Sequence, residues 1–286
     1  MLNQKSFLEV SGFLGQSGDE LKVKRNNREV VVEKSSKNSR LKLQYGLHQE
    51  FLRAKIEDDR ILLAPKIRKE FARGKYEMEY IFGQPLGFAL ENLPEKRMVG
   101  ILHQIEDHLR ALMDRAQYVS SPNHDLMAKV SELEKQLHSF GLPKSAISRL
   151  NRFESDLENS FLPQGLCHGD FSLENILHVN STNNLVMLDF LDSPIQTPMI
   201  DFGRFWLDVN YGWWLSHSTE STTSWLNRQK LRRITLKIAA DYEIPLYLID
   251  QFAFFAALRI LPYTQKINRL ARLKLVIMNS VYGRVE

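Results

Sequence analysis

The pattern of hydrophobic and polar residues changes part-way along the chain. Before residue 84, short apolar or alternating runs bounded by turn residues are typical of β-strands. The runs that predict strands are Phe7–Val10, Leu21–Lys24, Glu29–Lys34, Ile61–Pro65 and Tyr76–Ile81. Between the first two runs, residues 11–18 carry glycine at every third position, which predicts a turn.

One helix is predicted in this first part, over residues 40–57, because Leu43, Leu47, Phe51 and Ala54 recur at helical spacing. After a breaker at residues 82–86, the helical period dominates. It covers residues 96–118, 125–138, 144–162 and most of 200–286. The change near Gly83 predicts a small β-rich lobe over residues 1–83 and a larger, mainly helical lobe over residues 84–286.

A second β pattern interrupts the helical part. Ile176–Val179 and Leu185–Leu188 are apolar runs, and the polar stretch Ser181–Asn184 between them predicts a hairpin. This hairpin would bring Asn175 and Asp189, which flank it, to the same open edge. Carboxylate and amide oxygens suit magnesium, which usually takes only one or two carboxylates from the protein.

Asp170 lies five residues before Asn175. If it lies off the metal, its carboxylate is free to accept a proton from an attacking hydroxyl. A capped turn is the alternative explanation for Asp170 and Asn175 as an isolated pair. The hairpin and its second carboxylate favour the metal site.

The first lobe offers a glycine turn and a lysine that suit phosphate. Glycine lets backbone amides approach a phosphate closely, although the turn lacks the Lys-Ser or Lys-Thr of a Walker loop, and an ordinary hairpin turn is the alternative. Lys34 ends a β-branched run and would reach phosphates if a carboxylate held it. Glu50, on the edge of the predicted helix stripe, is the assigned partner. Glu57 or Gln49 would serve if the helix were rotated.

Composition and charge narrow the class of protein. The chain has 286 residues, 43% of them hydrophobic, which supports extensive cores. A net charge of +4 is too mild to indicate nucleic acid. From Trp225 onward, however, there are eleven Lys or Arg residues and only four acids. This excess indicates either a solvated basic helical face or a site for an anionic partner or substrate.

We expect no membrane span and no signal segment, since no apolar run approaches eighteen residues and residues 1–5 lead into no apolar block. Cys167 is the single cysteine, so the chain forms no intrachain disulfide. These features predict a cytoplasmic protein.

The order of these features resembles that of a known family. His168-Gly169-Asp170, Asn175 five residues later and Asp189-Phe190 after the hairpin are similar to the motifs of the aminoglycoside phosphotransferase and choline kinase-like branch of the protein kinase-like fold. The resemblance is specific over residues 166–205 and looser over residues 10–85. It implies an α+β, two-lobed fold with ATP as phosphoryl donor and Mg²⁺ as cofactor.

The resemblance also implies roles for individual residues. Asp170 looks like the catalytic base, Asn175 and Asp189 like the magnesium ligands, Lys34 like the lysine on the nucleotide phosphates, and Glu50 like its partner. Gly15, Ser17 and Gly18 of the glycine turn are the further nucleotide-binding candidates. Glu79, Tyr80 and Ile81 join them by position only, because a strand that crosses a lobe junction can offer backbone groups to an adenine edge.

A literal Asp-Phe-Gly occurs at residues 201–203. It follows Pro198-Met199-Ile200 and not the hairpin strand, so we do not assign the metal to it. Asp201 resembles instead the structural aspartate of the family, which helps to hold the catalytic loop. Asp192 is a lesser candidate for a second metal contact.

The acceptor of the phosphoryl group is a small molecule in this hypothesis. Gly169 replaces the arginine that reads a phosphorylated loop in many protein kinases, and the segment from Asp189 to Asp201 is too short for such a loop. Acceptor-binding candidates on the helical lobe are Asp208, Tyr211, Trp214 and Arg259. A neutral or anionic sugar or other polyol is the predicted acceptor. Alternatives are a choline or amino-alcohol kinase and a catalytically silent nucleotide-binding protein.

Overall fold

A computed structural model gives the arrangement of the chain. It describes residues 10–14, 19–25, 29–37, 39–119, 124–137, 140–158, 161–191, 193, 195–214, 220–264, 270–271, 273–274 and 276–277. The predicted turn residues Gly15, Ser17 and Gly18 and the metal candidate Asp192 lie outside these residues, as does most of the strand predicted at Phe7–Val10.

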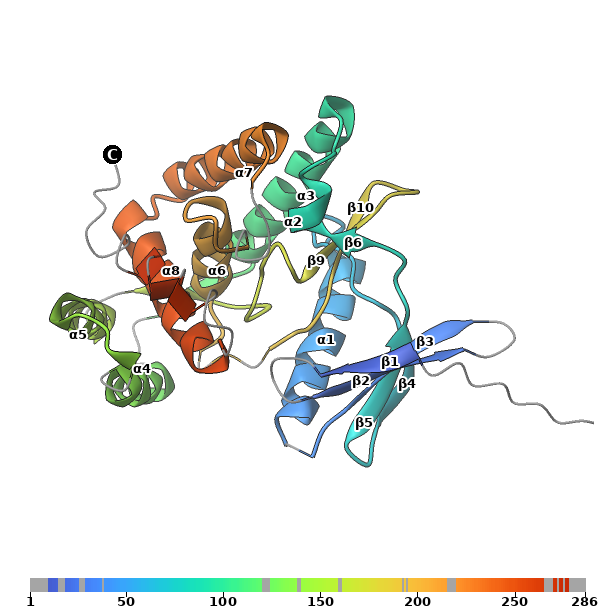
Figure 1. Cartoon of the computed structure of the whole chain (residues 1–286), viewed down its shortest axis with the longest axis horizontal. Helices are drawn as coiled ribbons and strands as arrows, with labels where there is room; N and C mark the ends of the chain where they lie inside the picture. Colours follow the sequence, from blue (N-terminus) through green and yellow to red (C-terminus); the bar gives the residue numbers. More distant parts are fainter. Residues whose placement is uncertain are drawn as a thin grey trace, which may run out of the picture.

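The N-terminal region is a five-stranded antiparallel sheet with one long helix against it (Figure 1). Its strands are β1 (Val10–Leu14), β2 (Glu20–Arg25), β3 (Val30–Ser35), β4 (Ile67–Ala72) and β5 (Lys75–Glu79), and its helix is α1 (Arg40–Glu57). The spatial order is β1-β2-β3-β5-β4. The predicted helix at residues 40–57 is confirmed at both ends.

Two predictions in this region are wrong, one of a turn and one of a strand. Residues 11–14 continue β1 and are not a turn. Ile61–Pro65 forms no strand: its Leu63 makes only an isolated parallel bridge to Val186. The strand actually formed, β4, was missed because its central residues, Arg68, Lys69 and Glu70, are all charged, and this run carries no alternation.

The C-terminal region is mainly helical, as predicted. Its helices are α2 (Leu86–Ala89), α3 (Glu95–Asp114), α4 (His124–Leu137), α5 (Lys144–Glu158), α6 (Pro198–Val209), α7 (Thr222–Asp241) and α8 (Leu246–Ile260), followed by the 3-10 turn η3 (Leu261–Tyr263). Short strands connect them: β6 (Gln84–Pro85), β7 (Gln117–Val119), β8 (Leu162–Gln164), β9 (Ile176–Val179) and β10 (Asn184–Met187).

The packing of α6 on α8 is the centre of this region. A Cβ at Gly203 would lie 2.5 Å from the backbone carbon of Phe252, so glycine there permits the close approach of the two helices. Contrary to the expectation that no apolar run approaches eighteen residues, Leu246–Tyr263 is long and apolar enough to cross a membrane, but 67% of it is buried inside the protein. This segment is therefore the core helix of the C-terminal region.

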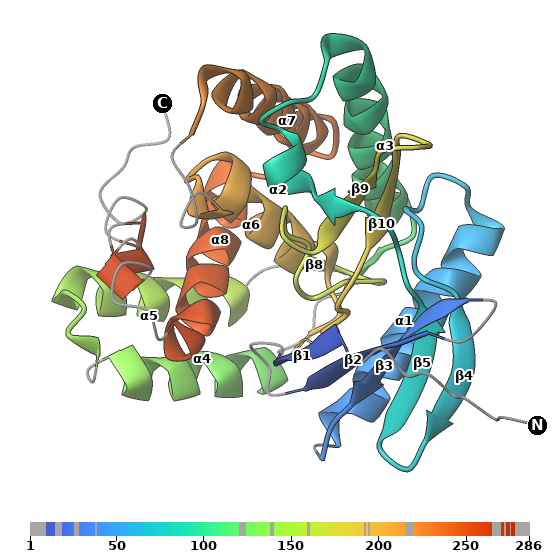
Figure 2. The same ribbon diagram turned by 45° about the vertical axis from the view of Figure 1, so that its right-hand side comes forward.

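Helix α1 belongs to two hydrophobic cores. Near its start, Leu41 and Tyr45 pack with Tyr76 of the sheet in a small cluster. Nearer its end, Leu47 and Phe51 join the large core of the C-terminal region. Figure 2 shows the β9–β10 hairpin beside α3, facing this N-terminal region. Through these two sets of contacts, α1 joins the N-terminal sheet to the C-terminal region.

Candidate active site

The predicted hairpin is present and places the two metal candidates side by side. Its strands pair in antiparallel register with Ile176 opposite Met187. One step further, the Leu188 amide donates to the Asn175 carbonyl oxygen at 2.8 Å. Asp189 then turns out of the strand with φ of 58°, a left-handed conformation that strands do not use. Asn175 and Asp189 therefore stand together at the open end of the hairpin.

Two donors fix the carboxylate of Asp170. The Asn175 side-chain amide donates to Asp170 Oδ2 at 2.8 Å and to the Asp170 carbonyl oxygen at 3.0 Å. Arg204 Nε donates to the other carboxylate oxygen, Oδ1, at 2.6 Å. The Asp170 side chain is still 25% exposed. It is a carboxylate held in one orientation and open to solvent on one side.

Arg204 is a residue that the sequence interpretation missed. It is buried on α6 and bridges Asp170 to Asp208, whose Oδ1 accepts from Arg204 Nη1 at 2.9 Å. The signal was the spacing of four residues between Arg204 and Asp208, which places an ion pair on one face of a helix whose neighbours are apolar.

The structure corrects the assignment of Asp208 to the acceptor. Its side chain is fully buried and accepts from the Leu173 amide at 2.8 Å as well as from Arg204. Burial raises the pKa of Asp208 to about 6, while the Arg204 guanidinium opposes this shift. A carboxylate saturated by buried donors holds the loop and the arginine, and does not face an acceptor.

Asp201 holds the catalytic loop, as predicted. Its carboxylate accepts from the backbone amides of His168 at 2.6 Å and of Gly169 at 2.9 Å. Burial raises the pKa of Asp201 to about 7. Gly169 has φ of 83°, and a Cβ there would lie 2.2 Å from the Leu191 carbonyl oxygen, so the loop requires glycine at this position.

Lys34 reaches the site, but not with the predicted partner. Its ammonium group lies 2.5 Å from Asp189 Oδ1 and 3.4 Å from Asp19 Oδ2. Burial alone would lower the pKa of Lys34, but the negative charge around it, Asp189 first, raises this pKa above its ordinary value.

The pairing of Glu50 with Lys34 is wrong because α1 is rotated relative to the predicted stripe. The sheet-facing residues begin at Leu41 and Tyr45, while Leu43 is 60% exposed. Glu50 is exposed and lines a cavity of about 300 Å³ with Arg53 and Arg115. The alternatives fail too: Gln49 donates to the Tyr45 hydroxyl, and Glu57 pairs with Arg115.

A cluster of buried aromatic and histidine rings joins α1 to the catalytic loop. Phe190 stacks on His48 with ring centroids 4.8 Å apart and lies 4.6 Å from the ring of His168. Phe51 of α1 contacts Phe190 and also His108 of α3. Burial lowers the pKa of His48 and His168 to about 4 and that of His108 to about 3. These rings are therefore neutral packing residues at neutral pH.

The oxygen atoms at the open end of the hairpin fit a magnesium ion. The Asn175 amide nitrogen is used by Asp170, which turns the side-chain oxygen of Asn175 away from that bond. The Asp189 side chain is 40% exposed. The described residues contain no group of three or more His, Cys, Asp or Glu that could hold a metal. One carboxylate and one amide oxygen suit magnesium, whose remaining ligands come from phosphates and water.

The strand that crosses between the lobes uses part of its backbone internally. The Glu79 amide donates to the Lys66 carbonyl and the Tyr80 amide to the Val30 carbonyl. Those two amides are therefore not available to an adenine edge. Ile81 follows them in the connection to β6. Its backbone amide forms no such bond in the described structure, so Ile81 remains a candidate for contact with an adenine edge.

The predicted acceptor residues separate into buried and accessible ones. Trp214 is 2% exposed and packs so closely on α2 that a Cβ at Gly87 would lie 2.8 Å from its ring, so it is not a stacking platform. Tyr211 donates its hydroxyl to Asp250. Arg259 is half-buried and donates to the Gly169 carbonyl oxygen at 3.4 Å, which places a cation at the catalytic loop.

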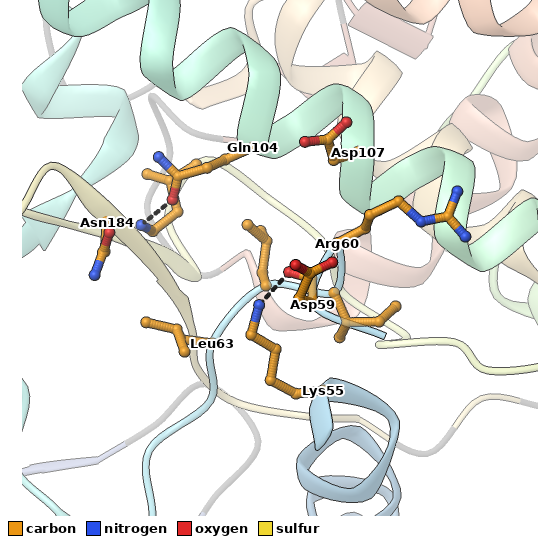
Figure 3. Close-up of a pocket in the computed structure, with 10 residues that line it drawn as sticks. Lys55, Asp59, Arg60, Leu63, Gln104, Asp107 and Asn184 are labelled. Atoms are coloured by element: carbon orange, nitrogen blue, oxygen red, sulfur yellow. Dashed lines mark hydrogen bonds between the residues drawn. The ribbon is translucent and has the colours of Figure 1, made fainter. Parts of the chain in front are cut away.

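A polar cavity of about 280 Å³ lies apart from these residues (Figure 3). The labelled side chains around it are Lys55, Asp59, Arg60, Leu63, Gln104, Asp107 and Asn184. Lys55 donates to the Asp59 carbonyl, and Gln104 accepts from the Leu185 amide at 2.9 Å. None of the predicted catalytic, metal-binding or nucleotide-binding residues lines this cavity.

The chain belongs to the phosphotransferase enzyme family: the model of that family matches residues 78–233, which include the whole catalytic loop and hairpin. It is therefore a small-molecule kinase with the protein kinase-like fold. No curated protein matches the chain.

Solved structures show the same fold at low identity. The aminoglycoside phosphotransferase APH(4)-Ia, in complex with AMP-PNP and hygromycin B, has a TM-score of 0.63 and 12% identity over 98% of this chain and 95% of that chain. A putative fructosamine-3-kinase from Haemophilus somnus has a TM-score of 0.58 and 10% identity, over 96% and 92% of the two chains. The ethanolamine kinase of Plasmodium vivax has a TM-score of 0.55 and 14% identity, over 98% and 84%.

Proposed function

We propose that this protein transfers the γ-phosphoryl group of ATP, with Mg²⁺, to a hydroxyl of a small sugar or other polyol in the cytoplasm. The observation that carries the proposal is the meeting of Lys34, Asp189, Asn175 and Asp170 in one connected set of contacts. Lys34 lies 2.5 Å from Asp189, Asp189 and Asn175 flank the same hairpin, and Asn175 donates to Asp170 at 2.8 Å.

The nucleotide would lie between the lobes, with residues 1–83 as the nucleotide-binding lobe and residues 84–286 carrying the catalytic loop and acceptor site. Asn175 and Asp189 would hold Mg²⁺, and Lys34 would contact the phosphates. When bound, the ion neutralises charge on the β- and γ-phosphates. The exposed Asp189 carboxylate and the side-chain oxygen of Asn175 support this assignment.

Asp170 would orient the acceptor hydroxyl and accept its proton as the oxygen attacks the γ-phosphorus. Arg204 and Asn175 use one donor on each carboxylate oxygen, which limits rotation and leaves further lone pairs for the hydroxyl. In phosphoryl transfer, the protein contributes mainly positioning and charge neutralisation.

The charges near Asp170 favour a neutral or anionic acceptor over an amine. Arg259 places a cation at the catalytic loop. The acids predicted or found nearby are used internally, Asp208 by Arg204 and Asp250 by Arg149. Neither of these two carboxylates is therefore free to bind the cation of a choline or amino-alcohol acceptor. The named relatives act on diverse compounds, so the fold does not choose between these acceptors.

The test is an acceptor screen that measures ADP release from Mg·ATP with a panel of sugars, polyols, sugar acids and amino alcohols. The proposal predicts stimulation by a polyol or an acidic sugar derivative, and loss of that stimulation in Asp170→Ala. Nucleotide binding without stimulation by any compound would favour the catalytically silent alternative. Stimulation by amino alcohols alone would favour the amino-alcohol kinase.

A further inference from the structure

Lys34 is a buried cation that requires a counter-charge. Its side chain is only 3% exposed, and an ammonium group at that depth is strongly disfavoured unless a carboxylate pairs with it. Within the described part of the chain, its ion-pair partners are Asp189 and Asp19. The question is which of them holds Lys34 while nucleotide is bound.

Helix α1 supplies no carboxylate for this purpose. Lys34 is directly opposite Tyr76 in the sheet, and Tyr45 of α1 packs edge-on against Tyr76 with ring centroids 5.2 Å apart. The buried polar residues of α1 are Gln44 and His48, both uncharged at neutral pH, and the side-chain oxygen of Gln44 has no partner. The acids of α1, Glu50 and Glu57, are both exposed.

Asp189 is the closer partner, but it has a second task in the proposed function. It stands at the open end of the hairpin beside Asn175, with 40% of its side chain exposed. A carboxylate that ligates Mg²⁺ shares its charge with a divalent ion, which weakens its attraction for a nearby ammonium group. With the metal in place, Asp189 neutralises Lys34 less, and the phosphates and Asp19 supply the remaining negative charge.

We propose that Asp19, and not a carboxylate on α1, is the residue that pairs with Lys34 while nucleotide is bound. Asp19 Oδ2 lies 3.4 Å from the ammonium nitrogen, and its side chain is only 6% exposed. This burial shields the pair from solvent, which makes the attraction stronger than at the surface. The inference rests on the proposed function, because it assigns Lys34 to the nucleotide phosphates.

The position of Asp19 gives the pair a mechanical consequence. Asp19 directly precedes β2, and the register places Glu20 opposite Ser35 and Leu21 opposite Lys34. Asp19 is also the first described residue after residues 15–18, which lie outside the described part of the chain. The ion pair therefore ties the end of the β1–β2 connection to the lysine, and Asp19 acts as a positioning residue that orients Lys34 towards phosphates.

The test is a double-mutant cycle on nucleotide affinity, which needs no acceptor. Calorimetric titration with Mg·AMP-PNP compares the wild type, Asp19→Asn, Lys34→Met and the double variant. Glu20→Gln is the matched control, because it removes the same charge from the next residue, where Glu20 forms an exposed pair with Lys22. Melting temperatures show whether each variant is folded.

We expect Asp19→Asn to bind Mg·AMP-PNP about tenfold more weakly than the wild type, the usual size of a lost charge-assisted bond. The double variant should bind no more weakly than Lys34→Met alone, and Asp19→Glu should recover part of the affinity. Glu20→Gln should bind as the wild type does.

Three results would overturn the inference while leaving the proposed function standing. These are wild-type affinity in Asp19→Asn, a full additional loss from Asp19→Asn in the Lys34→Met background, and weakened binding in Glu50→Gln but not in Asp19→Asn. Failure of the wild type to bind Mg·AMP-PNP would overturn both proposals. If Asp19→Asn does not fold but the double variant does, the result supports the pairing, because the double variant lacks both charges. If neither variant folds, the inference is overturned.

Discussion

The catalytic loop and the N-terminal sheet hold their charged residues in different ways. Asp170 takes both of its partners from its own lobe: Asn175 lies five residues away, and Arg204 lies on α6, 34 residues further on. Lys34 takes one of its two partners from a distant part of the chain, since Asp189 lies 155 residues further on, in the other lobe.

The two networks also differ in which contacts nucleotide binding can change. The loop network is closed within one lobe, where the buried Arg204, Asp208 and Asp201 fix its conformation. The contact between Lys34 and Asp189 crosses the lobes and involves a half-exposed carboxylate. We therefore expect the acid–base geometry to be preformed, and the lysine network to rearrange when phosphates and metal enter.

The largest effect is expected from Asp170→Asn. The amide keeps the shape of the side chain but cannot accept the hydroxyl proton, so kcat should fall by about 100-fold to 10,000-fold. Nucleotide affinity and melting temperature should change little, because the amide oxygen can still accept one of the two bonds. Steady-state kinetics with an acceptor from the screen measures this change. A kcat within threefold of the wild type would show that Asp170 is not the base.

Asp189→Asn and Asp201→Asn should have opposite signatures. Asp189→Asn should weaken Mg²⁺ binding to the nucleotide complex by about tenfold or more, with little loss of stability. Asp201→Asn should leave Mg²⁺ affinity near that of the wild type and destabilise the fold by about 1–3 kcal/mol, since it disturbs a buried acceptor of two amides. Metal titrations and thermal melts measure both variants. The reverse pattern would place the metal at residues 201–203.

Arg204→Met should affect both rate and stability. The methionine fills part of the space but leaves Asp208 buried without its cation, at a cost of about 3–5 kcal/mol. Asp170 would also lose the bond from Arg204 that orients its carboxylate, so kcat should fall by about tenfold while KM for ATP stays constant. The control is Arg204→Met with Asp208→Asn, which removes both buried charges. Recovery of stability without recovery of kcat would separate the positioning of Asp170 from folding.

The smallest effect concerns pH. Burial lowers the pKa of His108 to about 3 from an ordinary value of 6.5, so the folded protein binds fewer protons than the unfolded chain between these values. The neutral His108 therefore costs the folded protein nothing above pH 6.5, and the free energy of unfolding decreases as the pH falls from 6.5 to about 3. Asp201 and Asp208, whose pKa values burial raises to about 7 and about 6, act in the opposite direction.

For that reason the comparison is made between the wild type and His108→Leu, which share the two acids. Between pH 6.5 and 4, the wild type should lose about 1–3 kcal/mol more of its free energy of unfolding than the variant. The loss of the bond from the Leu62 amide to His108 is independent of pH and does not alter the slope. Equal slopes in chemical denaturation would contradict neutral burial of His108.

Much of the C-terminal site could be predicted because its parts are close in sequence. The hairpin register follows from two apolar runs and a polar turn, so the proximity of Asn175 and Asp189 was fixed by local pattern. The role of Asp201 in holding the loop was also expected, and the amide bonds from His168 and Gly169 confirm it.

The lysine network could not be predicted in the same way, because it depends on how α1 is rotated. This helix packs on the sheet near its start and on the large core near its end, so its buried residues occupy more than one stripe. Periodicity alone could not place Leu43 on the exposed side or remove Glu50 from the lysine. Asp19 carried no signal, since its partner lies across a strand pair whose register the sequence did not specify.

In the proposed reaction, a phosphoryl group passes from ATP to a hydroxyl at Asp170. This transfer is tested most directly by following the labelled γ-phosphoryl group in the wild type and in Asp170→Asn, with the acceptor that the screen identifies. We expect a labelled phosphomonoester of a polyol or acidic sugar derivative with the wild type and almost none with the variant. Label found only in inorganic phosphate, or equal transfer by both proteins, would contradict it.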